Sequence, residues 1–310
     1  MLSVLIPVYN HDVNSLVKTL DQQLAATGIA YEIILADDCS EKQYQDKNIS
    51  LASTERIQYI QNQANIGRAK IRNLLADNSK YPYLLFIDCD ACIHHQDYII
   101  KYIEAINKMR MHPKFVINGG VAYQEEKPDK KYYLRWFYGK KREEEKASLR
   151  AQNPYHHFTP FNVIISKAIF EQLRFDESLT SYGHEDTLFG YQLKTHKIPY
   201  LHIDNPLIHN GLDTNEEFLQ KIRTSIDNII YLSKNQQFDI SLWKENKLLK
   251  AYRHCNSVGL QNSLASYFKN NQIKMQERLS SKPNMKLLDL YKLSYLAFKN
   301  IEEKKHVSRG

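Results

Sequence analysis

Glycine is scarce in this sequence. The 310 residues include 10 glycines, and these form neither a G-x-x-x-x-G-K nor a G-x-G-x-x-G pattern. Such patterns let a backbone loop wrap around phosphate groups. A phosphate-bearing ligand of this chain would therefore have to be held by cationic side chains and by a metal ion.

Cysteine is scarce as well. Cys39, Cys89, Cys92 and Cys255 are too few and too irregularly spaced for a disulfide framework. Cys89 and Cys92 form a C-x-x-C, but a zinc site would need a second such pair. We interpret the cysteines as packing residues, with redox or zinc chemistry as the alternative.

Long apolar runs are missing too. No stretch approaches the roughly 18 to 20 apolar residues of a spanning helix, and Met1 leads directly into the strand-like LSVLIPVY instead of a secretory leader. We therefore expect a cytoplasmic protein. The net charge of +7 suits anionic partners such as nucleotides or phospholipid headgroups. No zinc-finger or RNA-recognition pattern supports a nucleic-acid partner.

What the chain does contain is a regular alternation of apolar β-rich runs and segments of helical period. The expected strands are residues 2–8, 31–37, 56–60, 83–88 and 115–122. This rhythm predicts an α/β fold with a mostly parallel sheet flanked by helices. After residue 213 the pattern is almost wholly helical, so we expect a domain at 1–212 and a helical C-terminal extension at 213–310.

Acidic residues follow two of the expected strands. Asp37 and Asp38 end one, and Asp88 and Asp90 end another. Ligands of parallel sheets bind beyond the carboxyl ends of the strands, and residues two apart in an extended chain point to the same side. Asp88 and Asp90 could therefore hold a divalent cation that clamps a diphosphate. The alternative is a solvated pair of strand-end carboxylates.

Five motifs occur in a characteristic order over about residues 1–212: SVLIPVYN, ILADDCS, NIGRAKIRN, FIDCDA and YGHEDTLFGYQL. In these motifs the chain resembles the family 2 glycosyltransferases, which have the GT-A fold, a nucleotide-binding α/β domain. No Q-x-x-R-W and no transmembrane segments follow. The resemblance therefore implies an inverting, non-processive enzyme.

The resemblance also implies roles for single residues. Pro7 and Tyr9 would shape the loop around a uracil, and Asp38 would accept a hydrogen bond from the base. Arg68, at a helix start, would face the nucleotide, and Asp88 would hold the ribose or a metal-bound water. Asn65, in the same motif as Arg68, is placed with these nucleotide-binding residues.

The implied metal site consists of Asp90 and His209. An imidazole ligand favours Mn²⁺ over Mg²⁺, so we expect Mn²⁺, with Mg²⁺ as the second possibility. His202 is a weaker candidate than His209. The alternative for His209 is an ordinary surface histidine.

Transfer with inversion needs a base that takes the proton of the acceptor hydroxyl, and it needs no protein nucleophile. Asp186, in GHEDT, is the candidate base, and Glu185 would hydrogen-bond the acceptor or donor sugar. The alternative is that both are simply favourable acids in the first turn of a helix.

A basic and aromatic segment at 124–157 interrupts the motifs and would be an excursion or a lid. It is either a solvated insertion with one amphipathic helix or a contact surface for an anionic membrane or an acceptor. The second interpretation rests on Tyr132, Tyr133, Arg135, Trp136, Phe137, Tyr138, Lys140, Lys141 and Arg142.

Taken together, these features predict a metal-dependent transferase that moves a sugar from a UDP-sugar to a glycan or lipid-linked acceptor, as in surface polysaccharide biosynthesis. Peripheral contact with the inner face of a membrane stays open. One alternative is a sugar nucleotidyltransferase, although its glycine-rich opening loop is missing where IPVYNHD stands. Another is a nucleotide-sugar-binding or scaffold module without catalysis.

Overall fold

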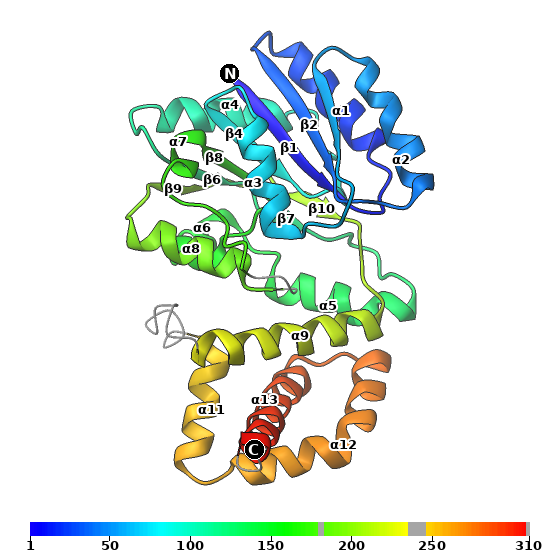
Figure 1. The fold of residues 1–310 in the computed structure, drawn as a ribbon, viewed down its shortest axis with the longest axis vertical. Coiled ribbons are helices and arrows are strands. Elements are labelled where there is room, and N and C mark those ends of the chain that lie inside the picture. The colour runs from blue at the N-terminus through cyan, green and yellow to red at the C-terminus, as the bar shows by residue number, and fades with distance from the viewer. Residues whose placement is uncertain (179–182, 235–245, 308–310) are drawn as a thin grey trace. The chain divides into compact units, whose positions relative to one another are not determined.

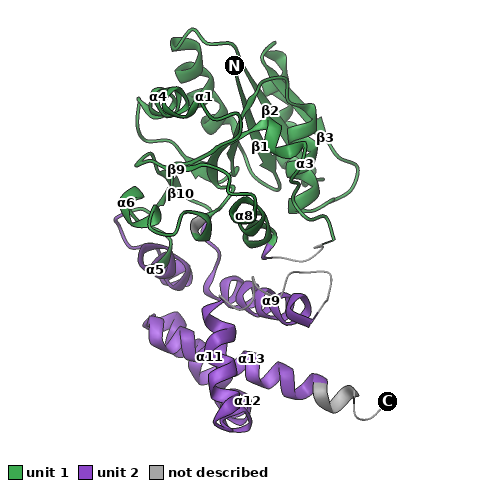
Figure 2. Cartoon of the chain, turned by 90° about the vertical axis from the view of Figure 1, so that its left-hand side faces the viewer, with its two compact units in different colours: residues 1–124, 142–180, 185–211 green, residues 125–141, 181–184, 212–310 purple. Residues whose placement is uncertain are grey.

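The chain folds into two compact units, which Figure 2 colours separately. The computed structural model describes residues 1–178, 183–234 and 246–307. Unit 1 comprises residues 1–124, 142–180 and 185–211, and unit 2 comprises residues 125–141, 181–184 and 212–310. The segment at 125–141 therefore belongs to the same unit as the C-terminal helices.

A seven-stranded sheet forms the centre of unit 1 (Figure 1). Its order is β3 (Ile57–Gln61), β2 (Tyr31–Asp37), β1 (Leu2–Val8), β4 (Tyr83–Ile87), β8 (Asn162–Ser166), β6 (Val116–Asn118) and β9 (Tyr200–His202). β8 runs antiparallel to β4 and β6, and the remaining neighbours are parallel. The predicted α/β fold with a mostly parallel sheet is confirmed.

Helices cover both faces of this sheet because successive strand residues point to opposite sides. In β1, Val4 and Ile6 join a core with α1 (Asn14–Ala26) and α4 (Tyr98–Met109), whereas Leu5 joins a core on the other side. That second core contains α3 (Arg68–Asn78), α7 (Lys167–Phe170) and α8 (Glu185–Thr195). The shorter elements of unit 1 are α2 (Lys42–Asn48), η1 (Ile49–Ser53), α6 (Ala147–Arg150) and η3 (Pro154–His157).

A second, three-stranded sheet of order β5 (Ala91–Cys92), β10 (Leu207–His209) and β7 (Val121–Ala122) completes unit 1. β10 pairs antiparallel with β5, and His209 lies opposite Ala91. β5 follows β4 after three residues, so this pairing brings the 207–209 segment to the carboxyl end of β4.

Unit 2 is helical. It contains η2 (Lys130–Tyr132), α5 (Tyr133–Arg142), α9 (Asn215–Lys234), α11 (Lys247–Ser257), α12 (Gln261–Ser281) and α13 (Met285–Val307). α13 packs against α9, α11 and α12, and the ring of Phe268 on α12 contacts the rings of Tyr291, Tyr295 and Phe298. Among the described helices, none has the length and apolar composition that crossing a membrane requires.

The basic and aromatic segment packs part of its aromatic side chains within unit 2. Leu134, Arg135 and Trp136 on α5 are buried, and the neighbouring aromatic side chains are half-buried. Tyr138 packs on Phe218 of α9 with ring centroids 5.2 Å apart. Aromatic residues at helical spacing thus pack α5 against α9, and contact of this segment with a membrane or an acceptor stays a prediction.

Candidate active site

Asp38 organises the loop that leads into α3. It is buried, and its two oxygens accept hydrogen bonds from the backbone N–H groups of Ile66, at 2.7 Å, and Gly67, at 3.0 Å. Gly67 has a φ of +86°, which favours glycine, and α3 begins at Arg68. Each carboxylate oxygen can accept a second hydrogen bond, so contact with a base remains open to Asp38. Asp37 is fully buried and accepts from Tyr59 Oη at 2.9 Å.

The other expected nucleotide-binding residues lie around the same edge of the sheet. Pro7 is half-buried in β1, opposite Ala36 of β2, and Tyr9 follows the strand with 54% of its surface exposed. Asn65 and Arg68 are exposed on the loop and at the start of α3. Of these residues, Arg68 acts on Asp88, because its positive charge lowers the pKa of that carboxyl.

Arg72 joins two acids that lie far apart in the sequence. Its guanidinium is buried, with Nη2 3.0 Å from Asp88 Oδ1 and Nη1 3.5 Å from Glu185 Oε1. Sequence reasoning missed Arg72, although it is part of the NIGRAKIRN motif. The available signal was its spacing, because Arg68 and Arg72 are one helical turn apart and share a face.

Asp90 and His209 face each other. The Nε2 atom of His209 is 3.5 Å from Asp90 Oδ2, and the backbone N–H of Asn210 donates to the carbonyl of Asp90 at 3.0 Å. Gly211 lies so close to the Asp90 carboxylate that a side chain at this position would collide with it. The other carboxylate oxygen of Asp90, Oδ1, is buried and has no hydrogen-bond partner among the described residues. A buried oxygen of this kind is a fitting metal ligand.

Asp88 and Asp90 lie in different electrostatic surroundings. Burial opposes the charge of Asp88, but the guanidinium groups of Arg72 and Arg68 outweigh it and hold the pKa of this carboxyl below its usual value. Burial and the charge of Asp88 raise the pKa of Asp90, and His209 opposes that rise. Of the two acids, Asp90 therefore gains more from a nearby cation.

Glu185 and Asp186 begin α8. Glu185 is buried beside Arg72, whereas Asp186 is partly exposed and accepts a hydrogen bond from the backbone N–H of Thr187 at 2.7 Å. Burial, followed by the charge of Glu185, raises the pKa of Asp186 to about 6. A carboxylate with this pKa is suited to accept a proton near neutral pH.

A buried polar network supports the strands next to these acids. Arg150 is buried and donates to Asn118 Oδ1 at 2.6 Å and to the carbonyl of Ile203 at 2.7 Å, and it lies 3.1 Å from Nδ1 of His202. The other ring nitrogen of His202 is 3.1 Å from the carbonyl of Pro154. Both ring nitrogens of His202 are thus engaged by the protein, so this histidine is less suited than His209 to bind a metal ion.

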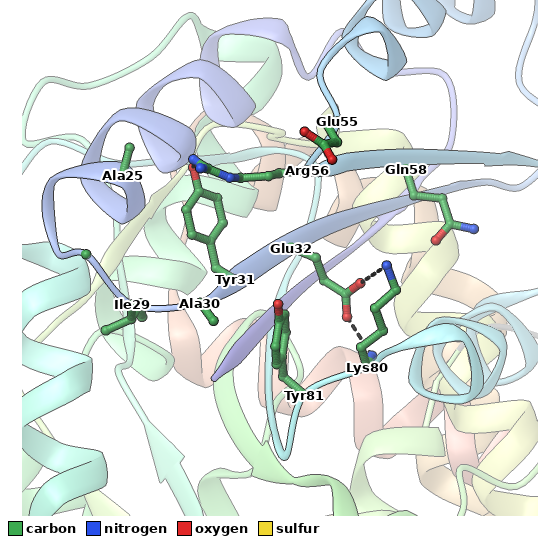
Figure 3. A pocket seen from close by; sticks show the side chains of 11 residues that line it. Ala25, Ile29, Ala30, Tyr31, Glu32, Glu55, Arg56, Gln58, Lys80 and Tyr81 are labelled. Atoms are coloured by element: carbon green, nitrogen blue, oxygen red, sulfur yellow. Dashed lines mark hydrogen bonds and ion pairs between the residues drawn. The ribbon is translucent and has the colours of Figure 1, made fainter.

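The four cysteines and a hollow on unit 1 add no further groups to this candidate site. All four cysteines are free thiols, and burial raises the pKa of Cys89 to about 12, so its thiol stays protonated. A hollow of about 520 Å³ opens beside the first residues of β2, where Tyr31, Glu32, Arg56 and Lys80 line it (Figure 3). It lies at the amino ends of the strands, the edge opposite Asp37 and Asp38.

Comparison with known proteins identifies sequence relatives. An uncharacterized glycosyltransferase of Haemophilus influenzae is 38% identical over 95 residues, covering 30% of each chain. Chondroitin synthase of Escherichia coli is 28% identical over 62% of this chain and 32% of its own length. Validoxylamine A glucosyltransferase of Streptomyces hygroscopicus is 28% identical over 64% of this chain and 49% of its own. The matches thus span about a third to a half of the length of these relatives.

Solved structures share the fold. A mannosyltransferase of Pyrobaculum calidifontis, solved in complex with GDP-Man and Mn²⁺, superposes with a TM-score of 0.59 at 14% identity, over 98% of this chain and 87% of that one. TarS 1-349 of S. aureus gives a TM-score of 0.51 at 16% identity, over 99% and 91%. Residues 3–174 match the family described as Glycosyl transferase family 2. Because this match covers more than half of the chain, the protein belongs to glycosyl transferase family 2, and it has the GT-A fold.

Proposed function

We propose that the protein transfers a sugar from a UDP-sugar to a glycan or lipid-linked acceptor, with inversion and with a divalent metal ion. We place this reaction in the synthesis of a surface polysaccharide and in the cytoplasm. The observation that carries the proposal is the meeting of Asp88, Asp90 and His209 with the Arg72–Glu185 ion pair at the carboxyl edge of the sheet. This is the edge where ligands of parallel sheets bind.

Asp90 and His209 would hold the metal ion. Within residues 1–178, 183–234 and 246–307, no three His, Cys, Asp or Glu side chains lie together in a way that could hold a metal. Oxygens of the donor diphosphate would therefore complete the coordination. The buried, unpartnered Oδ1 of Asp90 supports this arrangement, and the related mannosyltransferase binds Mn²⁺ together with its nucleotide sugar. The bound cation would neutralise charge on the departing diphosphate.

Nucleotide binding would use the loops around Asp38. Pro7 and Tyr9 would border the uracil, Asp38 would accept from the base, and Asn65 and Arg68 would lie beside the nucleotide. Asp88 would face the ribose, with its negative charge maintained by Arg72 and Arg68. Because Asp38 already holds the Ile66 and Gly67 backbone, this loop would need little rearrangement to receive the nucleotide.

Asp186 would be the general base. Its carboxylate would take the proton of the acceptor hydroxyl while the hydroxyl oxygen forms a bond to the anomeric carbon and the bond to the diphosphate breaks. Its raised pKa supports this role. Glu185, fixed by Arg72, would hydrogen-bond the acceptor or donor sugar.

The substitution Asp186→Asn separates this proposal from the two alternatives. A transferase should lose turnover but keep metal-dependent UDP binding, measured by calorimetry with Mn²⁺. A binding or scaffold module would show no turnover with or without the change. A sugar nucleotidyltransferase would release pyrophosphate from UTP and a sugar phosphate, whereas a transferase releases UDP from nucleotide sugars. If no nucleotide sugar in a broad panel binds or releases UDP, the proposal is wrong.

A further inference from the structure

Charge is divided unequally between the two units. Unit 1 has 19 Lys and Arg against 22 Asp and Glu, a net charge of −3. Unit 2 has 23 against 13, a net charge of +10. The positive charge of the whole chain therefore resides in the helical unit. An asymmetry of this kind indicates that the basic part meets an anionic surface.

Within unit 2, the basic residues of α11 lie on one face of the helix. Its sequence KLLKAYRHCNS contains no acidic residue. Leu249 is buried and Leu248, Tyr252 and Cys255 are half-buried, so these residues mark the inward face. Lys247, Lys250, Arg253 and His254 are exposed and follow the opposite helical stripe.

Two aliphatic side chains are exposed where α11 ends. Gly259 has a φ of +73°, and the N–H of Leu260 donates to the carbonyl of Cys255 at 2.9 Å, which is the Schellman turn that terminates many helices. The turn presents Val258 with 56% and Leu260 with 49% of their surface exposed. Figure 1 shows α11 and α12 meeting at this turn.

We propose that this corner, formed by the outward face of α11 and the 258–260 turn, docks unit 2 on an anionic lipid bilayer. The basic side chains would meet the headgroups, and Val258 and Leu260 would enter the boundary with the acyl chains. The exposed aliphatic pair favours a bilayer over a nucleic acid or another soluble polyanion, since those partners offer no apolar layer. This inference goes beyond the transfer reaction and does not depend on it.

The contribution of the basic residues on α11 is tested in a flotation assay of the full chain. The vesicles consist of phosphatidylcholine, with and without phosphatidylglycerol. The variant K247Q/K250Q/R253Q should bind the anionic vesicles at least tenfold less, since each basic residue near such a surface contributes about fivefold. The matched control K42Q/K108Q/R110Q removes three exposed basic residues from unit 1 and should bind like the wild type. Equal loss in both variants, or no loss in the first, would overturn the proposal.

The contribution of the exposed aliphatic side chains is tested with the variant V258S/L260S. The matched control I100S/M111S alters two exposed aliphatic side chains of unit 1. The first variant should weaken vesicle binding severalfold and leave the melting temperature unchanged. The control should change neither vesicle binding nor the melting temperature. Added salt should release the wild type, because it screens the charges. Equal binding to neutral vesicles would refute a charge-driven contact. Binding to heparin or polyphosphate without binding to anionic vesicles would show that the partner is a soluble polyanion.

Discussion

The two units of this protein handle charge in opposite ways. In unit 1, acids gather at one edge of a sheet, and Arg72 and His209 lie directly against them. In unit 2, positive charge is spread over exposed helix faces, and the whole of α11 lacks an acid. The difference shows that buried charges need partners at fixed positions, whereas exposed charges act through their sum. Single substitutions should therefore matter in unit 1, and only groups of charge substitutions in unit 2.

The largest effect is expected at Asp90. The variant D90N should lower turnover about a thousandfold, which is about 4 kcal/mol of transition-state stabilisation, because an amide holds a divalent cation poorly. Metal-dependent UDP binding, measured by calorimetry, should weaken in parallel. The control D97N removes an acid that pairs with Lys101 at the surface, and its turnover should match the wild type. Full activity of D90N would show that Asp90 does not hold a metal ion. The contrast between fixed charges in unit 1 and summed charges in unit 2 would then lose its main example.

In unit 2, a large loss of stability is expected from a substitution in the hydrophobic core and not from one that removes a charge. Phe268 is buried among three aromatic rings, so F268A should lower the free energy of unfolding by about 3 to 5 kcal/mol. The neighbouring Tyr267 is 39% exposed, and Y267A should cost less than about 1 kcal/mol. Chemical denaturation followed by circular dichroism measures both. Equal losses would show that the α12–α13 contact is not the core of this unit.

Arg72 should affect the reaction without touching substrate. R72Q removes the cation between Asp88 and Glu185, and we expect a roughly 10- to 100-fold loss of kcat/KM. Because Arg72 lowers the pKa of Asp186, its loss should also move the acid limb of the pH profile to higher pH. R72K should restore the position of that limb and part of the rate. R174Q, which breaks an exposed pair with Asp77, is the control. An unchanged limb in R72Q would leave Arg72 a purely structural role.

The smallest effect is a pH dependence. Asp186 must be ionised to accept a proton, and its pKa is raised from 3.8 to about 6. The rate should therefore fall roughly tenfold for each pH unit below about 6. Asp90 titrates as well, but added Mn²⁺ competes with the proton there and not at Asp186. A limb that stays near 6 at saturating Mn²⁺ belongs to Asp186, and a limb near 3.8 contradicts the assignment.

Much of unit 1 could be predicted from sequence because its strands are long and buried. β1 and β2 coincide with the expected segments, and their register places Val8 opposite Asp37 at the carboxyl edge. The approach of Asp88 and Asp90 to that edge follows from the same parallel pairing. A nearly continuous apolar run of about seven residues is typical of a strand that is buried on both faces of a parallel sheet.

Other parts of the site could not be predicted from local pattern. β5 has two residues and β10 has three, which is too short for a periodic signal, yet their pairing brings His209 to Asp90. The ion pair of Arg72 with Glu185 bridges 113 positions of sequence and depends on the packing of α3 and α8 in one core. The segment at 124–157 predicted one amphipathic helix, but its local pattern could not show that residues 125–141 would join the unit of the C-terminal helices.

The close approach of Gly211 to Asp90 limits how this protein can diverge. The side chain of any other residue at 211 would displace the carboxylate, so this position stays a glycine as long as Asp90 keeps its place. Variation is easier to accommodate at positions with room for larger side chains, such as the exposed loop residues Tyr9 and Asn65.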